Sequence, residues 1–174
     1  MVMRLICALL VTLPVSAWAV GGGDEPPANP TVFCSGGKVY DPETKKCVKA
    51  ESGALDRDTL YETVRQLAYA GRYTDAQTVL AAMPENDPGR LTYMGFTHRK
   101  LGNHALAATY YQEAIDRDPS NILARSYMGQ GFVEKGEISK ALVQLHQIRA
   151  HGGAGTWSER SLAEAIESGN TSGY

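Results

Sequence analysis

Apolar and small residues recur at helical spacing through most of the chain, and the recurrence has a fixed period. The landmarks of one stretch are Met94-Gly95, Gly102, Ala107, Tyr111, Ala114 and Pro119, and the positions 34 residues later hold Met128-Gly129, Gly136, Ala141, Leu145, Ile148 and Gly153. Most of these positions keep their chemical character. A period of 34 residues with a small residue early, a glycine midway and an alanine five residues after it is typical of a helix-turn-helix repeat. The pattern therefore predicts one antiparallel helix pair in each period.

The small and turn-forming residues have physical roles in such a pair. Gly95 lies inside a helical pattern, where glycine costs roughly 1 kcal/mol relative to alanine, so it indicates that another helix comes close. Gly102 and Gly136 each follow a helical stretch and can take the left-handed conformation that ends a helix. Pro119 cannot continue a helix and closes the unit. We therefore expect repeat units at about 88–121 and 122–155.

A weaker copy precedes these two units, and a single helical pattern follows them. Gly71 stands where Gly102 stands, but the two glycines are 31 rather than 34 residues apart. Because the spacing inside the second helix is kept up to Met83 and Pro84 follows, we expect the three missing residues to be absent from the turn before Leu91. The first unit then covers about 57–87, a capping helix covers 157–168, and residues 169–174 are expected to fray.

The three copies resemble tetratricopeptide repeats, and the match is most specific over residues 88–121. The residues that fit the family pattern there are Leu91, Met94, Gly95, Ala107, Tyr111, Ala114 and Pro119, whereas His98 departs from it, because a Tyr or Leu is usual at that position. The resemblance implies an all-α fold over residues 54–168, an α-solenoid of about three helix-turn-helix repeats with a C-terminal capping helix. It also implies that the first helices line a concave groove. The groove-facing residues implied in this way include Tyr61, Arg65, Tyr69, Tyr93, Phe96, Arg99, Lys100, Tyr127 and Gln130.

The implied groove is rich in Tyr and Arg, which are over-represented among the residues that dominate binding energy at interfaces. We expect Arg65, Arg99 and Lys100 at equivalent places on successive first helices. A basic, aromatic strip of this kind favours a protein or peptide partner that carries carboxylates. The alternative is that Tyr93 and Tyr127 fill gaps between repeats and contact no partner.

The N-terminal residues have the pattern of a targeting segment. Arg4 precedes an apolar run over residues 5–15, and Ala17-Trp18-Ala19 has the form of a cleavage site, so residues 1–19 are predicted to be a signal peptide. The alternative is an uncleaved anchor, but the run is too short to span a membrane comfortably, and we expect no integral span after cleavage. Cleavage would remove one of the 17 basic residues and leave 16 against 19 acidic ones, a formal charge of −3. Residues 20–33 are rich in Gly and Pro and are predicted to be a flexible linker.

Cys34 and Cys47 flank a short segment, 34–48, between the linker and the repeats. Val39-Tyr40 has strand character, and the residues from Asp41 onward have turn chemistry, so a small hairpin closed by a disulfide is expected. The alternative is a metal site, but two cysteines supply only half of a tetrahedral zinc shell. A second alternative is that this loop contacts glycans, as small cysteine-closed modules do. An even number of cysteines in an exported chain favours the disulfide.

Composition and motifs point away from catalysis. The chain of 174 residues has 43% hydrophobic residues and a formal charge of −2, which favours neither nucleic acid nor a polyanionic surface as a partner. The four histidines form no metal-binding motif, and no nucleophile or phosphate-binding motif is present, so we expect no enzyme activity, no metal and no cofactor. The sequence therefore predicts an exported protein–protein interaction scaffold, periplasmic or secreted, that binds a peptide or protein in a concave groove. The alternatives are a cell-wall module that uses the Cys34–Cys47 loop and a structural homo-oligomer formed through the repeats.

Overall fold

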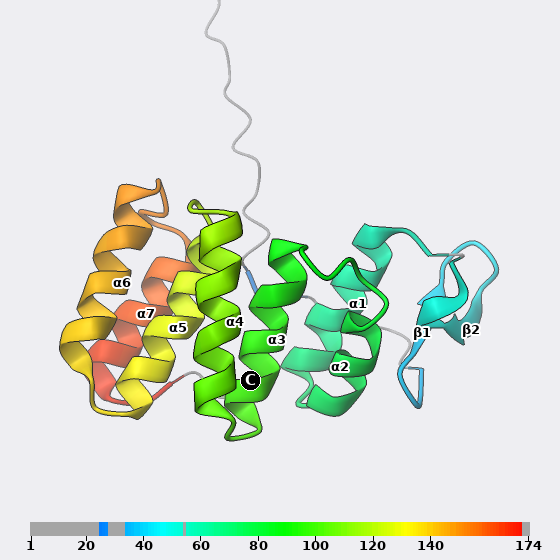
Figure 1. The fold of residues 1–174 in the computed structure, drawn as a ribbon, viewed down its shortest axis with the longest axis horizontal. Coiled ribbons are helices and arrows are strands. Elements are labelled where there is room, and N and C mark those ends of the chain that lie inside the picture. Colours follow the sequence, from blue (N-terminus) through cyan, green and yellow to red (C-terminus); the bar gives the residue numbers. More distant parts are fainter. Residues whose placement is uncertain (1–24, 28–33, 54, 172–174) are drawn as a thin grey trace, which may run out of the picture.

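The computed structural model describes residues 25–27, 34–53 and 55–171. The elements of this part are β1 (Lys38–Asp41), β2 (Lys46–Lys49), η1 (Ala50–Ser52), α1 (Arg57–Tyr69), α2 (Tyr73–Leu80), α3 (Pro88–Lys100), α4 (His104–Arg117), α5 (Ile122–Glu134), α6 (Ile138–Ala150) and α7 (Trp157–Ser168). Figure 1 shows the helices side by side along the long axis of the molecule, with the hairpin at the end formed by α1 and α2. The signal peptide expected at 1–19 lies outside the described residues, and so does most of the linker expected at 20–33.

Helices that follow each other in the chain pack as pairs, α1 against α2, α3 against α4 and α5 against α6 (Figure 1). The first helices of the pairs also contact one another in series, α1 with α3 and α3 with α5, and α7 continues this series against α5. This is the arrangement of an α-solenoid, in which each repeat is stabilised by its neighbours. The predicted all-α solenoid of three helix pairs and a C-terminal helix is therefore confirmed.

The turn inside each pair begins with a glycine in the left-handed conformation. Gly102 has φ of 82°, its N–H donates to Arg99 O (2.9 Å), and the N–H of Asn103 donates to His98 O (2.8 Å). These bonds satisfy carbonyls at the end of α3 that have no partner inside the helix. The corresponding glycines after α1 and α5 have φ of 74° and 71°. The predicted role of these glycines as helix caps is therefore confirmed.

The first repeat is shortened in its second helix and not in the turn that follows. α2 has 8 residues, whereas α4 has 14. The connection after α2 covers residues 81–87 and is longer than the connection after α4, residues 118–121. The expectation of a short turn before Leu91 was therefore wrong. Met83 explains the error, because its N–H donates to Leu80 O (3.1 Å) in a turn that carries its side chain into the core without a further turn of α-helix.

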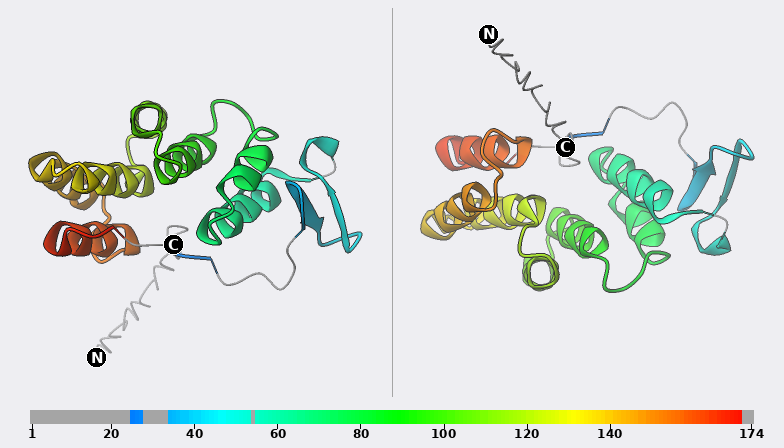
Figure 2. Two further views of the ribbon diagram at one scale, coloured as in Figure 1. Left: turned by 90° about the horizontal axis from the view of Figure 1, so that it is seen from below. Right: turned by 90° about the horizontal axis from the view of Figure 1, so that it is seen from above.

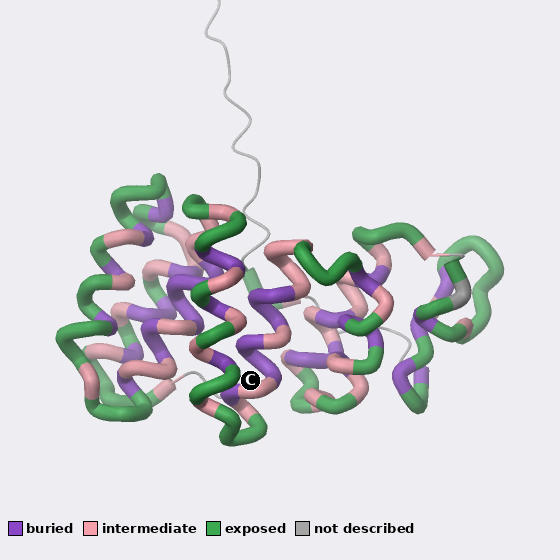
Figure 3. The backbone as a smooth tube through the Cα atoms, in the orientation of Figure 1, coloured by how far each residue is buried: buried purple, intermediate pink, exposed green. Residues whose placement is uncertain are grey.

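Glycines inside the first helices mark close approaches between helices. A Cβ at Gly95 would lie 2.5 Å from Cδ1 and Cε1 of Tyr111 on α4. A Cβ at Gly129 would lie 2.6 Å from a methyl group of Leu162 on α7. Gly95 thus faces the second helix of its own pair, whereas Gly129 faces the helix of the next repeat. Buried segments recur along the helices in Figure 3, as the helical period of the apolar residues predicts.

The N-terminal hairpin is a part of the solenoid core. Cys34 and Cys47 form a disulfide, so the alternative of a metal site at these two cysteines was wrong. β1 and β2 pair antiparallel, and Val39 on β1 is fully buried in the same apolar cluster as residues of α1 and α2. Arg72, after α1, donates to Cys34 O (2.9 Å), and Gly37 lies against Thr78 on α2. The hairpin therefore covers the apolar end of the first repeat, which a solenoid would otherwise expose to water.

The C-terminal tail folds back on the repeats in the part that the structure describes. Gly169 ends α7 in the left-handed conformation. The hydroxyl of Thr171 then donates to Glu134 Oε1 on α5 (2.8 Å). Residues 169–171 are therefore held against α5 and do not extend away from the fold as fraying would require, and residues 172–174 lie outside the described part.

Candidate functional site

The nine groove residues implied by the family resemblance fall into two groups. Those that the structure buries are Tyr93, Phe96, Arg99, Tyr127 and Gln130, and those that it leaves half-buried are Tyr61, Arg65, Tyr69 and Lys100. A fully buried side chain cannot line an open groove, so the placement of the first group on a free surface was wrong. The alternative that Tyr93 and Tyr127 fill gaps between repeats agrees with their burial.

Buried and half-buried aromatic rings form one cluster that joins all four helices of the first-helix series, α1, α3, α5 and α7. The rings of Phe96 on α3 and Tyr127 on α5 have centroids 4.7 Å apart. The hydroxyls of Tyr69 on α1 and Tyr127 are hydrogen-bonded at 2.8 Å. Trp157, the first residue of α7, lies 6.2 Å from Tyr127 and 6.4 Å from Tyr69 between ring centroids. Side chains of α1 and α7, the two ends of the series of first helices, thus meet, and they close the middle of the concave face.

Sequence reasoning assigned Trp157 only to the start of the capping helix. Its contact with Tyr69 links segments that are far apart in the sequence and depends on how the solenoid curves. A signal was present, because the large aromatic residue stands at the first position of a first helix, on the same series of helices as the predicted groove. Trp157 therefore belongs to the site that the concave face forms.

A chain of buried polar side chains runs beside the aromatic cluster. Arg99 Nη2 on α3 donates to Gln130 Oε1 on α5 (3.2 Å), and Gln130 Nε2 donates to Ser161 Oγ on α7 (3.0 Å). Arg99 Nη1 also pairs with the carboxylate of Glu134. The Arg99 side chain is only 1% exposed, so its charge needs this carboxylate and these hydrogen bonds to be tolerated inside the protein. Arg99 therefore ties α3 to α5, Gln130 extends the link to α7, and the Arg99 guanidinium is not available to a partner.

The two groove arginines are not at equivalent places on their helices. Arg65 lies four residues before Tyr69, the last residue of α1, and the residue four before Lys100, the last residue of α3, is Phe96. The expected equivalence of Arg65 with Arg99 was therefore wrong. Because Arg65 lies one turn earlier, its guanidinium stays near the surface, where Nη1 donates to Glu62 (2.9 Å) and the side chain is 12% exposed.

Lys100 and Tyr93 show the electrostatic effect of this packing. Burial and the neighbouring charge of Arg99 lower the pKa of Lys100. Burial raises the pKa of Tyr93 well above its usual range, because no water can solvate a phenolate there. Both shifts disfavour additional charge in the middle of the concave face.

The open part of the concave face lies at the N-terminal ends of the first helices. A groove of about 400 Å³ crosses α1, α3 and the start of α5, and it is lined by Arg57, Tyr61, Pro88, Gly89, Thr92, Asp118, Ser120, Asn121, Ile122 and Leu123. Arg57 stacks over the ring of Tyr61 (4.6 Å from Cζ to the centroid) and donates to both carboxylate oxygens of Asp87, at 2.9 and 3.2 Å. Asn121 Nδ2 donates to Thr92 Oγ1 (3.0 Å). Helix-capping residues thus form the walls and hold neighbouring repeats together.

Of these groove residues, Tyr61 was predicted from the sequence, whereas Arg57 and Asn121 were not. Asn121 is the N-cap of α5, where capping accounts for its type without a binding role, and Arg57 is the first residue of α1. Gly89 is the sequence feature that could have indicated the groove. A Cβ there would lie 2.7 Å from Cε2 of Tyr61, so glycine at the second position of α3 allows the aromatic ring to lie over the helix end.

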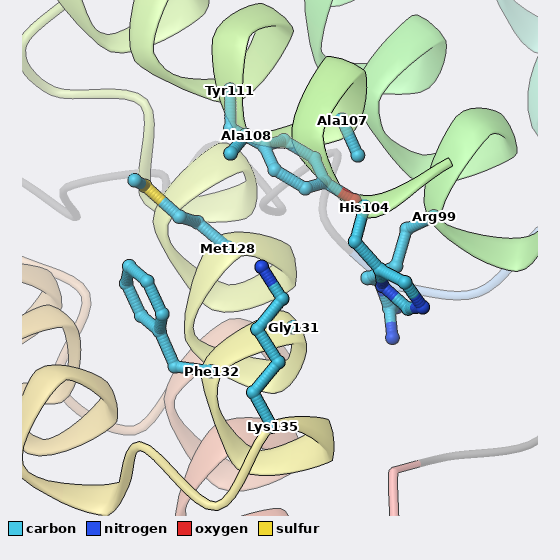
Figure 4. Close-up of a pocket in the computed structure, with 9 residues that line it drawn as sticks. All are labelled: Arg99, His104, Ala107, Ala108, Tyr111, Met128, Gly131, Phe132 and Lys135. Atoms are coloured by element: carbon cyan, nitrogen blue, oxygen red, sulfur yellow. The ribbon is translucent and has the colours of Figure 1, made fainter. Parts of the chain in front are cut away.

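A second hollow, between α3, α4 and α5, is too small for a ligand. Figure 4 shows its lining, in which the Tyr111 hydroxyl points towards Arg99 and His104. Its volume is about 20 Å³, which accommodates about one water molecule. Burial raises the pKa of Tyr111 to about 12. This hollow is a packing defect beside the buried arginine.

The described residues show neither a metal centre nor a membrane-spanning helix. No three His, Cys, Asp or Glu side chains in this part of the chain lie close enough together to hold a metal ion. Within the same residues, no helix is both long and apolar enough to cross a membrane.

Stacked helix pairs, a continuous series of first helices and a partly open concave face define the chain as a helical-repeat protein of the α-solenoid class. Residues 88–121 match the family model of the tetratricopeptide repeat, and this match supports a protein of that family. Comparison with curated proteins found no match, and comparison with solved structures found none either. Tetratricopeptide repeats are typically non-catalytic interaction modules, so the match supports a general role as a protein–protein interaction scaffold.

Proposed function

We propose that this protein is an exported interaction scaffold that binds an extended peptide segment of a partner protein along its concave face. The groove across the N-terminal ends of α1, α3 and α5 carries the proposal. It is long enough to touch three repeats, and it combines the aromatic ring of Tyr61 with the backbone and side chains of helix starts. Such mixed surfaces supply an apolar anchor together with hydrogen-bond donors.

Charge favours a partner segment with carboxylates. Arg57 lies at one wall of the groove with its side chain 44% exposed, and Arg65 lies two turns further along the same helix. Tyr61 lies between them on α1 and offers an apolar face. An acidic side chain would gain a charge-assisted hydrogen bond from either arginine, in competition with Asp87 and Glu62, the carboxylates that already pair with them. The buried residues Phe96 and Tyr127 contribute by holding the helices in place.

Export is part of the same proposal. The apolar run and the cleavage motif before residue 20 support a signal peptide, and the Cys34–Cys47 disulfide is of a kind that persists in oxidising compartments. We therefore place the mature protein in the periplasm or outside the cell. Mass spectrometry of the protein isolated from its native compartment tests this placement, because a mature chain that starts near Val20 and has no free thiol is expected.

The groove is tested by capture experiments with matched surface variants. Tyr61→Ala alters the open groove, whereas Val143→Ala alters an apolar residue that is 56% exposed on α6, away from the first helices. Partners that elute from wild-type protein should be lost with Tyr61→Ala and kept with Val143→Ala. The reverse pattern would place binding on the second helices and would refute the groove. Recovery of a glycan or of this chain itself, unaffected by Tyr61→Ala, would instead support a cell-wall module or a homo-oligomer.

A further inference from the structure

A short segment of the chain itself lies across the mouth of the concave face. Residues 25–27, Glu-Pro-Pro, precede the hairpin in sequence, but Figure 2 shows them between α7 and the side of the solenoid that α1 forms. Arg65 Nη2 on α1 donates to the backbone carbonyl of Glu25. Arg160 Nη2 on α7 lies 3.8 Å from Glu25 Oε1. One residue thus bridges the first and the last of the first helices.

Arg65 and Arg160 each use one guanidinium nitrogen within their own repeat and the other for this segment. Arg65 Nη1 donates to Glu62 on its own helix (2.9 Å), and Arg160 Nη1 donates to the carbonyl of Gly155 in the turn before α7 (2.6 Å). Each guanidinium is therefore oriented by its own repeat, and each directs Nη2 towards Glu25. Donors that are already oriented lose less freedom on binding, which is a property of a recognition site.

The segment also has the chemistry of a peptide ligand. Pro26 and Pro27 fix the backbone near an extended conformation, in which the carbonyls make no internal hydrogen bonds and can accept from a donor outside the segment. Glu25 adds a carboxylate. Acidic, proline-containing segments pay little entropy on binding because they are extended beforehand.

We propose that residues 25–27 act as an intramolecular ligand of the concave mouth and occupy, through Arg65 and Arg160, the place of an acidic, proline-containing segment of a partner protein. This inference rests on the proposed function and names the chemistry of the partner. A partner must displace the segment, so the chain limits its own binding. The Glu25 carboxylate contact is exposed at both side chains, 71% and 53%, so the contact is weak enough to be displaced.

The test measures whether the segment and a peptide compete for the same arginines. The probe is a fluorescent synthetic peptide with the sequence of residues 23–30, Gly-Asp-Glu-Pro-Pro-Ala-Asn-Pro, titrated into the disulfide-intact chain and followed by fluorescence anisotropy. In the triple variant Glu25→Ala, Pro26→Gly, Pro27→Gly, we expect the peptide to bind about fivefold more tightly than to wild type, the effect of losing one charge-assisted hydrogen bond and one exposed ion pair.

Variants in the arginines identify the site. In the triple-variant background, Arg65→Ala and Arg160→Ala should each weaken peptide binding about threefold or more, as loss of one charged donor implies. Arg117→Ala is the matched control, because this exposed arginine pairs with Glu113 on its own helix, α4, at 3.6 Å. A circular-dichroism melt of each variant ensures that the comparison is between folded proteins. Equal peptide affinity for wild type and triple variant, or no effect of Arg65→Ala and Arg160→Ala, would overturn the inference.

The experiments distinguish a failure of the intramolecular-ligand hypothesis from a failure of the proposed function. If the peptide fails to bind the triple variant while partner capture still depends on Tyr61, the groove remains supported as the partner site and the intramolecular-ligand hypothesis is refuted. If the peptide binds through Arg65 and Arg160 while partner capture ignores Tyr61, the mouth is a binding site and the groove assignment falls.

Discussion

Gly95→Ala tests whether the first helices are held against their partners as tightly as the structure shows. The added Cβ would lie 2.5 Å from two ring atoms of Tyr111 and 3.0 Å from a third. Tyr111 is 2% exposed, and the hollow beside its ring, between α3, α4 and α5, has a volume of about 20 Å³, so the ring has little room to turn away. Either α3 or α4 must shift, and every repeat that packs on this pair then shifts with it.

The expected magnitude is a balance of two opposing effects. Overpacking a core by one methyl group costs typically about 1–3 kcal/mol, and replacing a helical glycine by alanine gains about 1 kcal/mol. The free energy of unfolding should therefore fall by about 1 kcal/mol in Gly95→Ala. Gly131→Ala in α5 is the matched control, because its Cβ would meet only Cδ of the Arg99 side chain at 3.3 Å. This variant keeps most of the helical gain, so the two variants should differ by about 2 kcal/mol.

Urea denaturation followed by circular dichroism at 222 nm measures both variants under identical conditions. A difference of about 2 kcal/mol corresponds to roughly 6–10 °C in melting temperature for a domain of this size. If Gly95→Ala and Gly131→Ala stabilise the protein equally, α3 and α4 do not approach as described, and the pairing of these helices must be redrawn. A fall in both variants would mean that the Arg99 side chain is as immobile as the Tyr111 ring.

Three further outcomes are expected. Burial raises the pKa of Tyr111 to about 12 in the folded chain, against about 10 when unfolded. The free energy of unfolding is therefore unaffected below pH 10 and falls by about 2–3 kcal/mol as the pH rises to 12. In alkaline urea titrations, Tyr111→Phe should flatten this decline. Replacing Cys34 and Cys47 by serine should lower the free energy of unfolding by about 2–3 kcal/mol, whereas an unchanged urea midpoint would show that the hairpin contributes nothing to the solenoid. Burial alone would raise the pKa of Asp87, but the hydrogen bonds from Arg57 lower it, so the stabilisation that its carboxylate contributes is lost as the pH falls below about 4. Asp87→Ala should therefore cost about 1 kcal/mol at pH 7 and less in acid.

The repeat architecture could be predicted from the sequence because its determinants are local. A glycine after a helix, such as Gly102, ends that helix wherever it stands, and Pro119 stops the next one by covalent geometry. Gly95 indicated a close helix, since a glycine inside a helix has no other advantage. The length of α2 was not predicted, because Met83 reaches the core from a turn as well as from a helix. Side-chain spacing alone does not distinguish these two backbones.

The 34-residue period does not reveal whether a predicted groove residue is exposed or buried. Whether Tyr93 or Tyr127 faces a partner or a neighbouring helix depends on the curvature of the solenoid, which small shifts at each repeat interface set together. In this chain the curvature brings Trp157 to Tyr69, and the middle of the concave face closes. The residue-type rule that Tyr and Arg mark binding surfaces therefore included Tyr93, Arg99 and Tyr127, which pack against other repeats of the same chain.

The buried arginine nevertheless left a signal in the sequence that a search at the repeat period would detect. Arg99 and its carboxylate partner Glu134 are 35 residues apart, Arg99 and Gln130 are 31 apart, and Gln130 and Ser161 are 31 apart. Side chains that meet across adjacent repeats are separated by about one period, so complementary charges at that separation indicate an internal tie. A groove arginine without a carboxylate partner at that separation is the better candidate for binding, and among the described residues the carboxylate that Arg65 pairs with, Glu62, lies on its own helix.

Under the proposed function, the concave face of a solenoid this short serves both to hold the repeats together and to bind a partner, and these two roles exclude each other. Residues that join α1 to α7, such as Tyr69 and Trp157, stabilise the curvature only while they remain in contact, so a ligand cannot pass between them without a loss of stability. A partner must then lie along the rim, where the helix starts leave a groove and where Arg65 and Arg160 stand on either side of the mouth. Affinity is expected to depend on these rim residues, whereas substitutions in the buried centre should change the free energy of unfolding first and binding only as a consequence.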